Sequence, residues 1–237
     1  MSIRSTVMTV AMLLLTGSAM AAEGPDPSSG FLSDYSLLKP SVMGQLGQYI
    51  YIAPDAQKRL AGFNAIFVEQ PAIAVAPDSK VKTLQPNDAQ LIANTFQQLL
   101  TEQLAPSYIM AARSDPGVLT LRTALTNVYL QKPRRRLLSF TPVGIVVHVA
   151  KNALENVMQK VDLHEAVLQA ELIDSNTGEV IAEVYDPKGN IHNKKEYTDW
   201  KQIEDAFTLD AKRLSCQLHN AHSPPQQQTN CWAITSP

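Results

Sequence analysis

The feature that most constrains the fold is a stretch of alternating apolar and polar side chains between residues 163 and 187. Alternation with a period of two is typical of half-buried β-strands, because successive side chains point to opposite faces of a sheet. The apolar positions are Leu163, Ala166, Leu168, Ala170 and Leu172, followed by Val180, Ala182 and Val184. The sequence DSNTG at 174–178 separates the two sets and has the composition of a tight turn. The stretch therefore predicts a β-hairpin.

Two other stretches have the spacing of amphipathic helices, with apolar residues that recur every three or four positions. In residues 87–104 these are Ile92, Phe96, Leu99, Leu100 and Leu104. Asn87 or Asp88 is placed to cap this helix, and Pro106 is placed to end it. Near the C-terminus the apolar positions are Trp200, Ile203, Phe207, Leu214 and Leu218. One helix is therefore expected before the hairpin and one after it.

Further strands are predicted before the hairpin. Residues 62–75 are apolar on both faces, which is typical of a largely buried strand that Pro71 ends or bends. Residues 108–112 and 118–131 flank the turn sequence SDPG at 114–117, so they are expected to pair as a second hairpin. This order of elements predicts an α+β fold, with an antiparallel or mixed sheet of about five strands and two to three helices packed mainly on one face.

Composition favours a single α+β domain over residues 62–220, because apolar residues make up 45% of the chain and suffice for one core. Residues 22–61 mix apolar anchors with Pro and Gly and show no period, which predicts an irregular N-terminal arm that packs through its aromatic residues. Residues 221–237 are polar and rich in Pro and Gln, which predicts a flexible C-terminal tail.

Residues 1–21 have the layout of a secretory signal peptide. Arg4 supplies a positive charge, residues 7–15 are almost entirely apolar, and Ala19 and Ala21 are small residues at a cleavage site. The apolar run is about half the roughly 20 residues that a membrane-spanning helix needs, so no transmembrane segment is expected after cleavage. No cysteine stands directly after Ala21, and the nearest one is Cys216, so an N-terminal lipid anchor is not expected. These residues predict export to a bacterial periplasm.

The two cysteines, Cys216 and Cys231, lie close together in sequence. An oxidising compartment favours a disulfide between them, which would tether the C-terminal tail. The alternative is a metal site made by Cys216, His219, His222 and Cys231, because sulfur and imidazole suit zinc. Their spacing matches no standard zinc module, and thiolates are scarce in an oxidised compartment, so the disulfide is the preferred prediction and no cofactor is expected.

Five stretches carry a resemblance to a known family: FLSDYSLLKP at 31–40, YIAPDA at 51–56, TPVGIVV at 141–147, AELIDSNTGEVIAEVYD at 170–186 and WKQIEDAF at 200–207. With these stretches the chain resembles DUF3313, an uncharacterised family of bacterial envelope proteins. The resemblance implies an envelope location and no assigned activity. Many members look like lipoproteins, and this chain departs from them because it lacks the cysteine that would carry the lipid.

A candidate interaction patch is formed by Arg134, Arg135 and Arg136, which precede a predicted helix over residues 142–160. Three adjacent like charges repel one another unless solvent or an anionic surface compensates them. The patch and the helix therefore suggest docking on an anionic membrane surface or on an envelope protein. The alternative is a helix whose apolar stripe faces the core, preceded by a solvated charged loop.

The formal net charge is −2, and −3 without Arg4, so nucleic acid is not an expected partner. The sequence contains none of the common hydrolase, nucleotide-binding or metalloprotease motifs. Strand glutamates at 165, 171, 179 and 183 are expected to face solvent, because they alternate with the apolar positions. Asp34 and Tyr35 are a candidate recognition pair in the arm, and the alternative is a capping carboxylate beside a packed aromatic ring.

These observations favour a non-enzymatic periplasmic binding or envelope-assembly protein. The alternative is an envelope glycan or lipid hydrolase that uses two of the strand carboxylates as acid and base, which requires a pocket where the two groups face each other about 5 to 9 Å apart. The sequence does not indicate the oligomeric state.

Overall fold

The computed structural model describes residues 25–41, 48–130, 157, 161–162, 166–187 and 200–234. The strands in these residues are β1 (Lys39–Pro40), β2 (Tyr49–Ile52), β3 (Ala65–Val68), β4 (Ala72–Val75), β5 (Ile109–Met110), β6 (Leu119–Leu130), β7 (Val161–Asp162), β8 (Val167–Asp174) and β9 (Val180–Pro187). The helices are α1 (Ala56–Leu60), α2 (Pro86–Leu104) and α4 (Trp200–Ala221). Single 3-10 turns are η1 (Pro27–Ser29), η2 (Tyr35–Leu37), η3 (Pro225–Gln227) and η4 (Cys231–Ala233).

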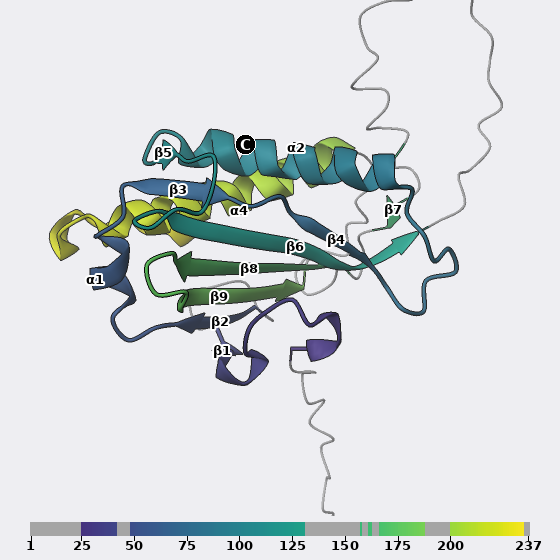
Figure 1. The fold of residues 1–237 in the computed structure, drawn as a ribbon, viewed down its shortest axis with the longest axis horizontal. Helices are drawn as coiled ribbons and strands as arrows, with labels where there is room; N and C mark the ends of the chain where they lie inside the picture. Colours follow the sequence, from purple (N-terminus) through teal and green to yellow (C-terminus); the bar gives the residue numbers. More distant parts are fainter. Residues whose placement is uncertain are drawn as a thin grey trace, which may run out of the picture.

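The strands form a mixed sheet built around the long strand β6 (Figure 1). The order across the sheet is β1-β2-β9-β8-β6-β3-β5, and the strands from β1 to β6 are antiparallel to their neighbours. β3 and β4 pair in parallel with successive parts of β6, and β7 pairs with its far end. The α+β class and the mixed sheet are confirmed, but among the described residues the sheet has eight strands, or nine with β7, where about five were expected.

The hairpin predicted from the alternation is formed by β8 and β9, which pair antiparallel. Its turn needs a residue with positive φ, which Gly178 supplies at 74°. Asp174 stabilises the turn by accepting a hydrogen bond from the amide of Asn176 at 2.9 Å. The Arg59 Nη2 atom lies 3.2 Å from Asp174 Oδ2, which ties the turn to the end of α1.

The second predicted hairpin, over residues 108–112 and 118–131, is wrong. β5 and β6 do not pair with each other, because β3 lies between them and runs parallel to both. The physical reason is that β3 is apolar on both faces and a central position buries it. Ile66 and Val68, which share one face of β3, are 0% and 4% exposed, and Ala65 and Phe67 on the other face are partly buried. A turn is still present one residue later, at 115–118, where the amide of Val118 donates to the carbonyl of Asp115 at 3.1 Å and Gly117 has a φ of 85°.

The N-terminal arm over residues 22–61 is not irregular throughout, because it contains β2 and α1. β2 pairs with β9 and satisfies the backbone groups at that edge of the hairpin. The expected packing through aromatic residues is present: the rings of Tyr35 and Tyr49 each meet Tyr185 edge to face, with centroids 6.4 and 6.3 Å apart.

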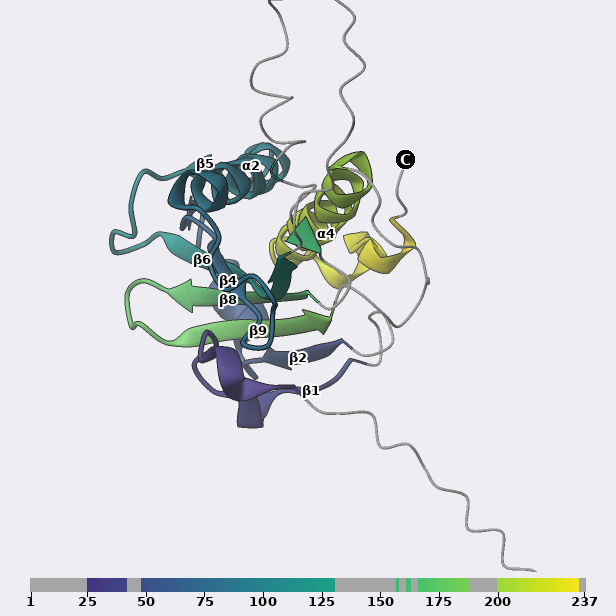
Figure 2. The same cartoon turned by 90° about the vertical axis from the view of Figure 1, so that its right-hand side faces the viewer.

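The molecule has three layers (Figure 2). α2 and α4 lie side by side on one face of the sheet, as predicted, and the rings of Phe96 and Phe207 stack between them with centroids 4.4 Å apart. The opposite face is covered by residues 26–38, which we call the N-terminal strap. Among the described residues, no helix combines the length and the apolar character that a membrane crossing needs.

Residues 224–234 of the predicted tail, which we call the C-terminal segment, lie along α4. The expected disulfide joins Cys216 on α4 to Cys231, which is 4% exposed. The side chain of Asn220 donates to the carbonyl of Thr229 at 2.8 Å and accepts from its amide at 2.9 Å. These hydrogen bonds hold the segment against the helix, which composition alone does not indicate.

Candidate functional site

A pocket of about 640 Å³ lies between the helix-facing side of the sheet and α4. Its floor is formed by consecutive cross-strand rows. In one row Thr123 on β6, Ala170 on β8, Val184 on β9 and Ile50 on β2 are neighbours, and in the next Leu121, Leu172, Ala182 and Ile52. The pocket therefore follows the edge of the sheet that the arm completes through β2.

The pocket exists because small side chains meet where the sheet and α4 face each other. Ala170 and Ala182 lie on the floor, and α4 presents Ala211 to the same space. Residues of this size leave a gap that larger side chains would fill. Ile52 also lines the pocket and is 60% exposed, so the pocket reaches the surface at the end of β2, beyond the residues that pair with β1.

Buried polar atoms accompany this largely apolar lining. Thr123 Oγ1 and Gln48 Oε1 belong to residues that line the pocket, and neither has a hydrogen-bond partner within the described part of the chain. A buried polar atom without a partner costs about 1–3 kcal/mol. A ligand that supplied a hydrogen-bonding group would remove that cost, so these atoms favour a binding site.

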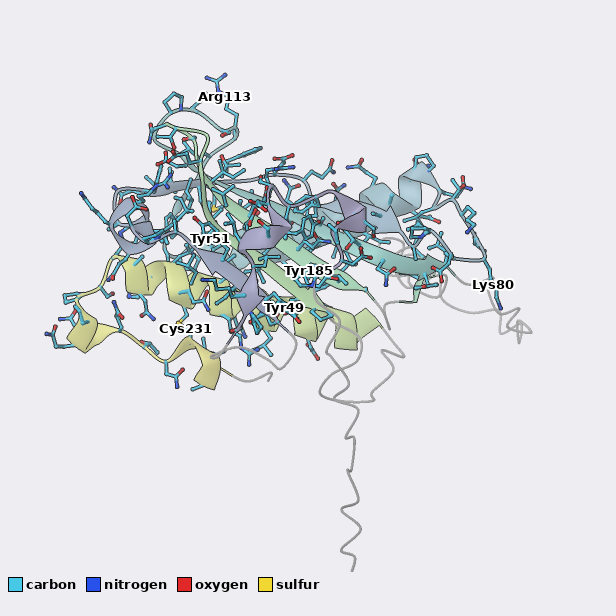
Figure 3. The ribbon with its side chains drawn as sticks, turned by 90° about the horizontal axis from the view of Figure 1, so that it is seen from below. Tyr49, Tyr51, Lys80, Arg113, Tyr185 and Cys231 are labelled. Atoms are coloured by element: carbon cyan, nitrogen blue, oxygen red, sulfur yellow. A yellow bond between two sulfur atoms is a disulfide. The ribbon has the colours of Figure 1, made fainter. Side chains whose placement is uncertain are left out.

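The wall on the outer side is formed by α4 and by the C-terminal segment. Asp210, Arg213 and Gln217 come from α4, and Gln228 comes from the C-terminal segment. The disulfide fixes this wall, because Cys231 itself lines the pocket. Figure 3 shows Cys231 beside α4.

A second polar cluster lies on the other face of the sheet, under the N-terminal strap. Glu171 on β8 and Glu183 on β9 are direct cross-strand neighbours and are 0% and 1% exposed. The expectation that these two glutamates face solvent is therefore wrong. Alternation does place them on the face opposite the helices, but the strap covers that face. Glu179 is exposed, as expected, and Glu165 lies outside the described residues.

The two carboxylates hold the strap in place. The amide of Ser33 donates to Glu171 Oε1 at 2.5 Å and to Glu183 Oε1 at 3.1 Å, and the Ser33 hydroxyl donates to Glu171 Oε1 at 2.8 Å. Arg122 on β6 completes the cluster, with its Nη1 atom 2.6 Å from Glu171 Oε2. Burial is the largest cause that raises the pKa of Glu183, and the charge on Glu171 raises it further, whereas the amides of Ser33 and Asp34 oppose the rise.

The next row of the same face also binds the strap. Tyr35 donates its hydroxyl to Gln169 Oε1 at 2.7 Å, and Gln169 Nε2 donates to Ser29 Oγ at 2.9 Å. Tyr185 accepts from the amide of Asp26 through its hydroxyl at 3.2 Å. Figure 3 shows Tyr185 beside Tyr49 and Tyr51 on this face. Side chains of the sheet therefore hold the strap at several points.

Asp34 and Tyr35 have the geometry of a capping carboxylate beside a packed aromatic ring. Asp34 Oδ1 accepts from the amide and the hydroxyl of Ser36 at 2.8 and 2.6 Å, which caps η2. These hydrogen bonds lower the pKa of Asp34. The Asp34 carboxylate is used within the strap, and the Tyr35 hydroxyl binds Gln169 on β8. A recognition role for the pair stays a prediction.

The metal alternative for Cys216, His219, His222 and Cys231 is wrong, because both sulfurs are joined in the disulfide and no thiolate is left for a metal. His222 Nε2 instead lies 2.9 Å from the hydroxyl oxygen of Tyr108. Arg134, Arg135 and Arg136 lie outside the described residues, as does most of the 142–160 helix, so the patch stays a prediction. Val157, from the apolar stripe, is described and is buried in the main core.

Sequence reasoning missed the pocket. Its signal is the set of small residues on one face of the hairpin, Ala170 and Ala182, at positions where a fully packed core would carry larger side chains. The signal is weak, because alanine also occurs at ordinary close contacts between a helix and a sheet.

The family model described as "Protein of unknown function (DUF3313)" matches residues 27–214 of the chain. No curated protein matches the chain. Among solved structures, a DUF4136 family protein from Bacteroides thetaiotaomicron is similar, with 14% identity over 74% of this chain and 96% of that chain and a TM-score of 0.38. The PelC dodecamer from Paraburkholderia phytofirmans is similar with 16% identity over 65% of this chain and 86% of that chain and a TM-score of 0.31.

Proposed function

From the premise that the chain belongs to the DUF3313 family of proteins of unknown function, we propose that it is a non-enzymatic binding protein that holds an apolar small molecule between its sheet and α4. The single observation that carries the proposal is the pocket of about 640 Å³. Binding sites for small molecules are typically concave, mostly apolar and a few hundred cubic ångströms in volume, with a small number of polar groups, as this pocket is.

The hydrolase alternative has less support. A glycosidase needs two carboxyl groups that open onto a substrate. Glu171 and Glu183 lie close together, but Ser33 and Arg122 already bind oxygens of this pair, and the strap covers them. Their contacts support a structural role, in which the pair holds the strap on the sheet.

Filling the pocket tests the proposal directly. The uncharged fluorophore N-phenyl-1-naphthylamine is expected to gain fluorescence on titration with the chain, because the apolar floor excludes water from the bound dye. Ala182→Phe places a ring in the pocket and is expected to weaken dye binding by about tenfold or more, since the ring occupies volume that the dye needs. Fluorescence titration gives both dissociation constants.

Ala112→Phe is the matched control, because Ala112 is exposed and lies outside the pocket. This variant should bind the dye like the unmodified chain. An absence of dye binding by the unmodified chain, or equal affinities for the Ala182 and Ala112 variants, would remove the pocket as a binding site.

We also propose that the protein works in the periplasm, near an envelope protein or a membrane surface. The disulfide between Cys216 and Cys231 supports this location, because such bonds persist in oxidising compartments. The test is the intact mass of protein from a periplasmic extract, measured without reduction. We expect it to equal the mass of a chain without residues 1–21, less the two hydrogen atoms that are lost when the disulfide forms. A full-length chain with free thiols in the cytosolic fraction would contradict this location.

A further inference from the structure

The pocket has a polar rim that a wholly apolar ligand would leave unused. We define the rim by four residues that line the pocket: Gln48, which directly precedes β2, Asp186 on β9, Gln217 on α4 and Gln228 in the C-terminal segment. Gln217 and Gln228 are exposed, whereas Gln48 and Asp186 are 8% and 4% exposed. The floor is apolar and the rim is polar, so the ligand that fits both has an apolar part and a hydrogen-bonding part.

The chemistry of the rim restricts the hydrogen-bonding part. Gln48 Nε2 donates to Asp186 Oδ2 at 3.2 Å, which leaves Gln48 Oε1 as a buried acceptor without a donor among the described residues. An acceptor needs a hydroxyl or an N–H from its partner, and a carboxylate or a phosphate diester has neither. The carboxamide of Gln217 can both donate and accept, which suits hydroxyl groups. Gln228 Nε2 already donates to the carbonyl oxygens of Asn220 and Ser223 at 3.2 and 3.3 Å, so Gln228 offers its side-chain oxygen as an acceptor.

The charges around the pocket disfavour an anionic head. Among the described residues, the charged side chains on the pocket side of the sheet are Asp186, Asp210 and Arg213, so acidic side chains outnumber basic ones. Glu183 also lines the pocket, but its carboxyl group binds the strap on the opposite face. An added negative charge would be repelled in this setting. Asp186, Asp210 and Arg213 each interact within the chain already, so a cationic head would find these carboxylates engaged.

We propose that the ligand of this pocket is an amphiphile with an uncharged, hydroxyl-bearing head, in the manner of an alkyl glycoside. The alkyl chain lies on the apolar floor over Ala170 and Ala182, and the head hydroxyls meet the carboxamides of the rim. This inference rests on the proposed function, because it names the chemical class of ligand for the same pocket.

The test is displacement of N-phenyl-1-naphthylamine by three eight-carbon amphiphiles below their critical micelle concentrations: octyl glucoside, sodium octanoate and octylamine. Octyl glucoside is expected to displace half of the dye at a concentration about tenfold lower than the other two. The reason is that two to three additional hydrogen bonds between its hydroxyl groups and the rim would strengthen binding by about that factor. Equal or better displacement by octanoate or octylamine would overturn the proposed head group. If the dye itself does not bind, the proposed function fails instead, so the two failures are distinguishable.

A variant of the rim separates recognition of the head from burial of the chain. Gln217→Leu is expected to reduce the preference for octyl glucoside over octanoate by about threefold or more, with dye affinity unchanged or slightly higher. Gln98→Leu is the matched control, because Gln98 is an exposed glutamine on α2 outside the pocket and pairs with Glu102 on the same helix. A preference that is the same in both variants would exclude Gln217 from head recognition.

Discussion

Arg122→Ala is expected to lower the free energy of unfolding by about 2–3 kcal/mol at pH 7.5. The guanidinium lies 2.6 Å from Glu171, a carboxylate with no exposed surface, and Glu183 lies opposite it across the strands. Without Arg122, a buried negative charge remains next to a second carboxylate. The expected cost is below that of a fully buried ion pair, because the side chain of Arg122 is itself 34% exposed.

The loss of unfolding free energy caused by Arg122→Ala should increase as the pH rises. The pKa of Glu183 is raised in the folded chain above its ordinary value of 4.5, so the folded state holds that proton more tightly than the unfolded state. The stability that Glu183 contributes is therefore fully present below pH 4.5 and is lost as the pH rises through the raised pKa. With Arg122 removed, the negative charge that Glu183 gains as the pH rises is less compensated, so the difference in stability between variant and parent should grow from pH 4.5 to pH 7.5.

Urea unfolding at both pH values measures these differences, with the midpoint compared at constant slope. Arg113→Ala is the control for loss of an exposed ion pair: the Arg113 side chain is 80% exposed and pairs with Asp115, so its loss should leave the midpoint nearly unchanged. Arg122 differs in that it pairs with the buried Glu171 and, at 3.5 Å, with Glu69. The double variant Arg122→Ala and Glu171→Gln should recover part of the loss, because it removes the charge left without a partner. Equal midpoints for the Arg122 and Arg113 variants would show that the Arg122 guanidinium does not stabilise the buried carboxylates of Glu171 and Glu183.

Local sequence patterns predict the parts of this fold that local forces determine. The helix over residues 87–104 differs from α2 (Pro86–Leu104) by one residue, because its apolar spacing and the following Pro106 are local signals. The turn at 174–178 is found for the same reason, since Gly178 provides the positive φ that the hairpin needs. Strand pairing between distant segments has no such signal. β3 lies between β5 and β6 because that position in the sheet buries its apolar side chains. The position becomes available only when the whole chain is packed.

The candidate site shows the same division. Alternation correctly places Glu171 and Glu183 on the face opposite the helices. Whether that face is exposed to solvent depends on the strap, which comes from residues more than a hundred positions earlier in the sequence. The strap sequence contains the evidence only in retrospect, because Ser33 and Tyr35 are ordinary polar residues until their partners are known. The pocket is still harder to predict, since it is a space left between elements and not a motif.

Replacing Cys216 and Cys231 together by serine is expected to have the other large effect, a loss of about 3 kcal/mol in the free energy of unfolding. The disulfide closes a loop of 15 residues, and opening it restores conformational entropy to the unfolded chain. Both cysteines are changed so that no free thiol forms bonds between molecules. Urea unfolding without reductant gives the value, and parent protein treated with dithiothreitol should unfold at the midpoint of the double variant.

The same variant also tests whether the C-terminal segment is a working wall of the pocket. Gln228 and Cys231 line the pocket, so release of the segment should weaken binding of the fluorophore as well as stability. Asn220→Ala provides the comparison, because it removes the hydrogen bonds to Thr229 and leaves the covalent link, at an expected cost of about 1 kcal/mol. If the serine variant loses stability but binds the dye as the parent does, the wall is dispensable and the ligand is held by the sheet and α4 alone. If neither property changes, the link between Cys216 and Cys231 constrains neither the unfolded chain nor the pocket.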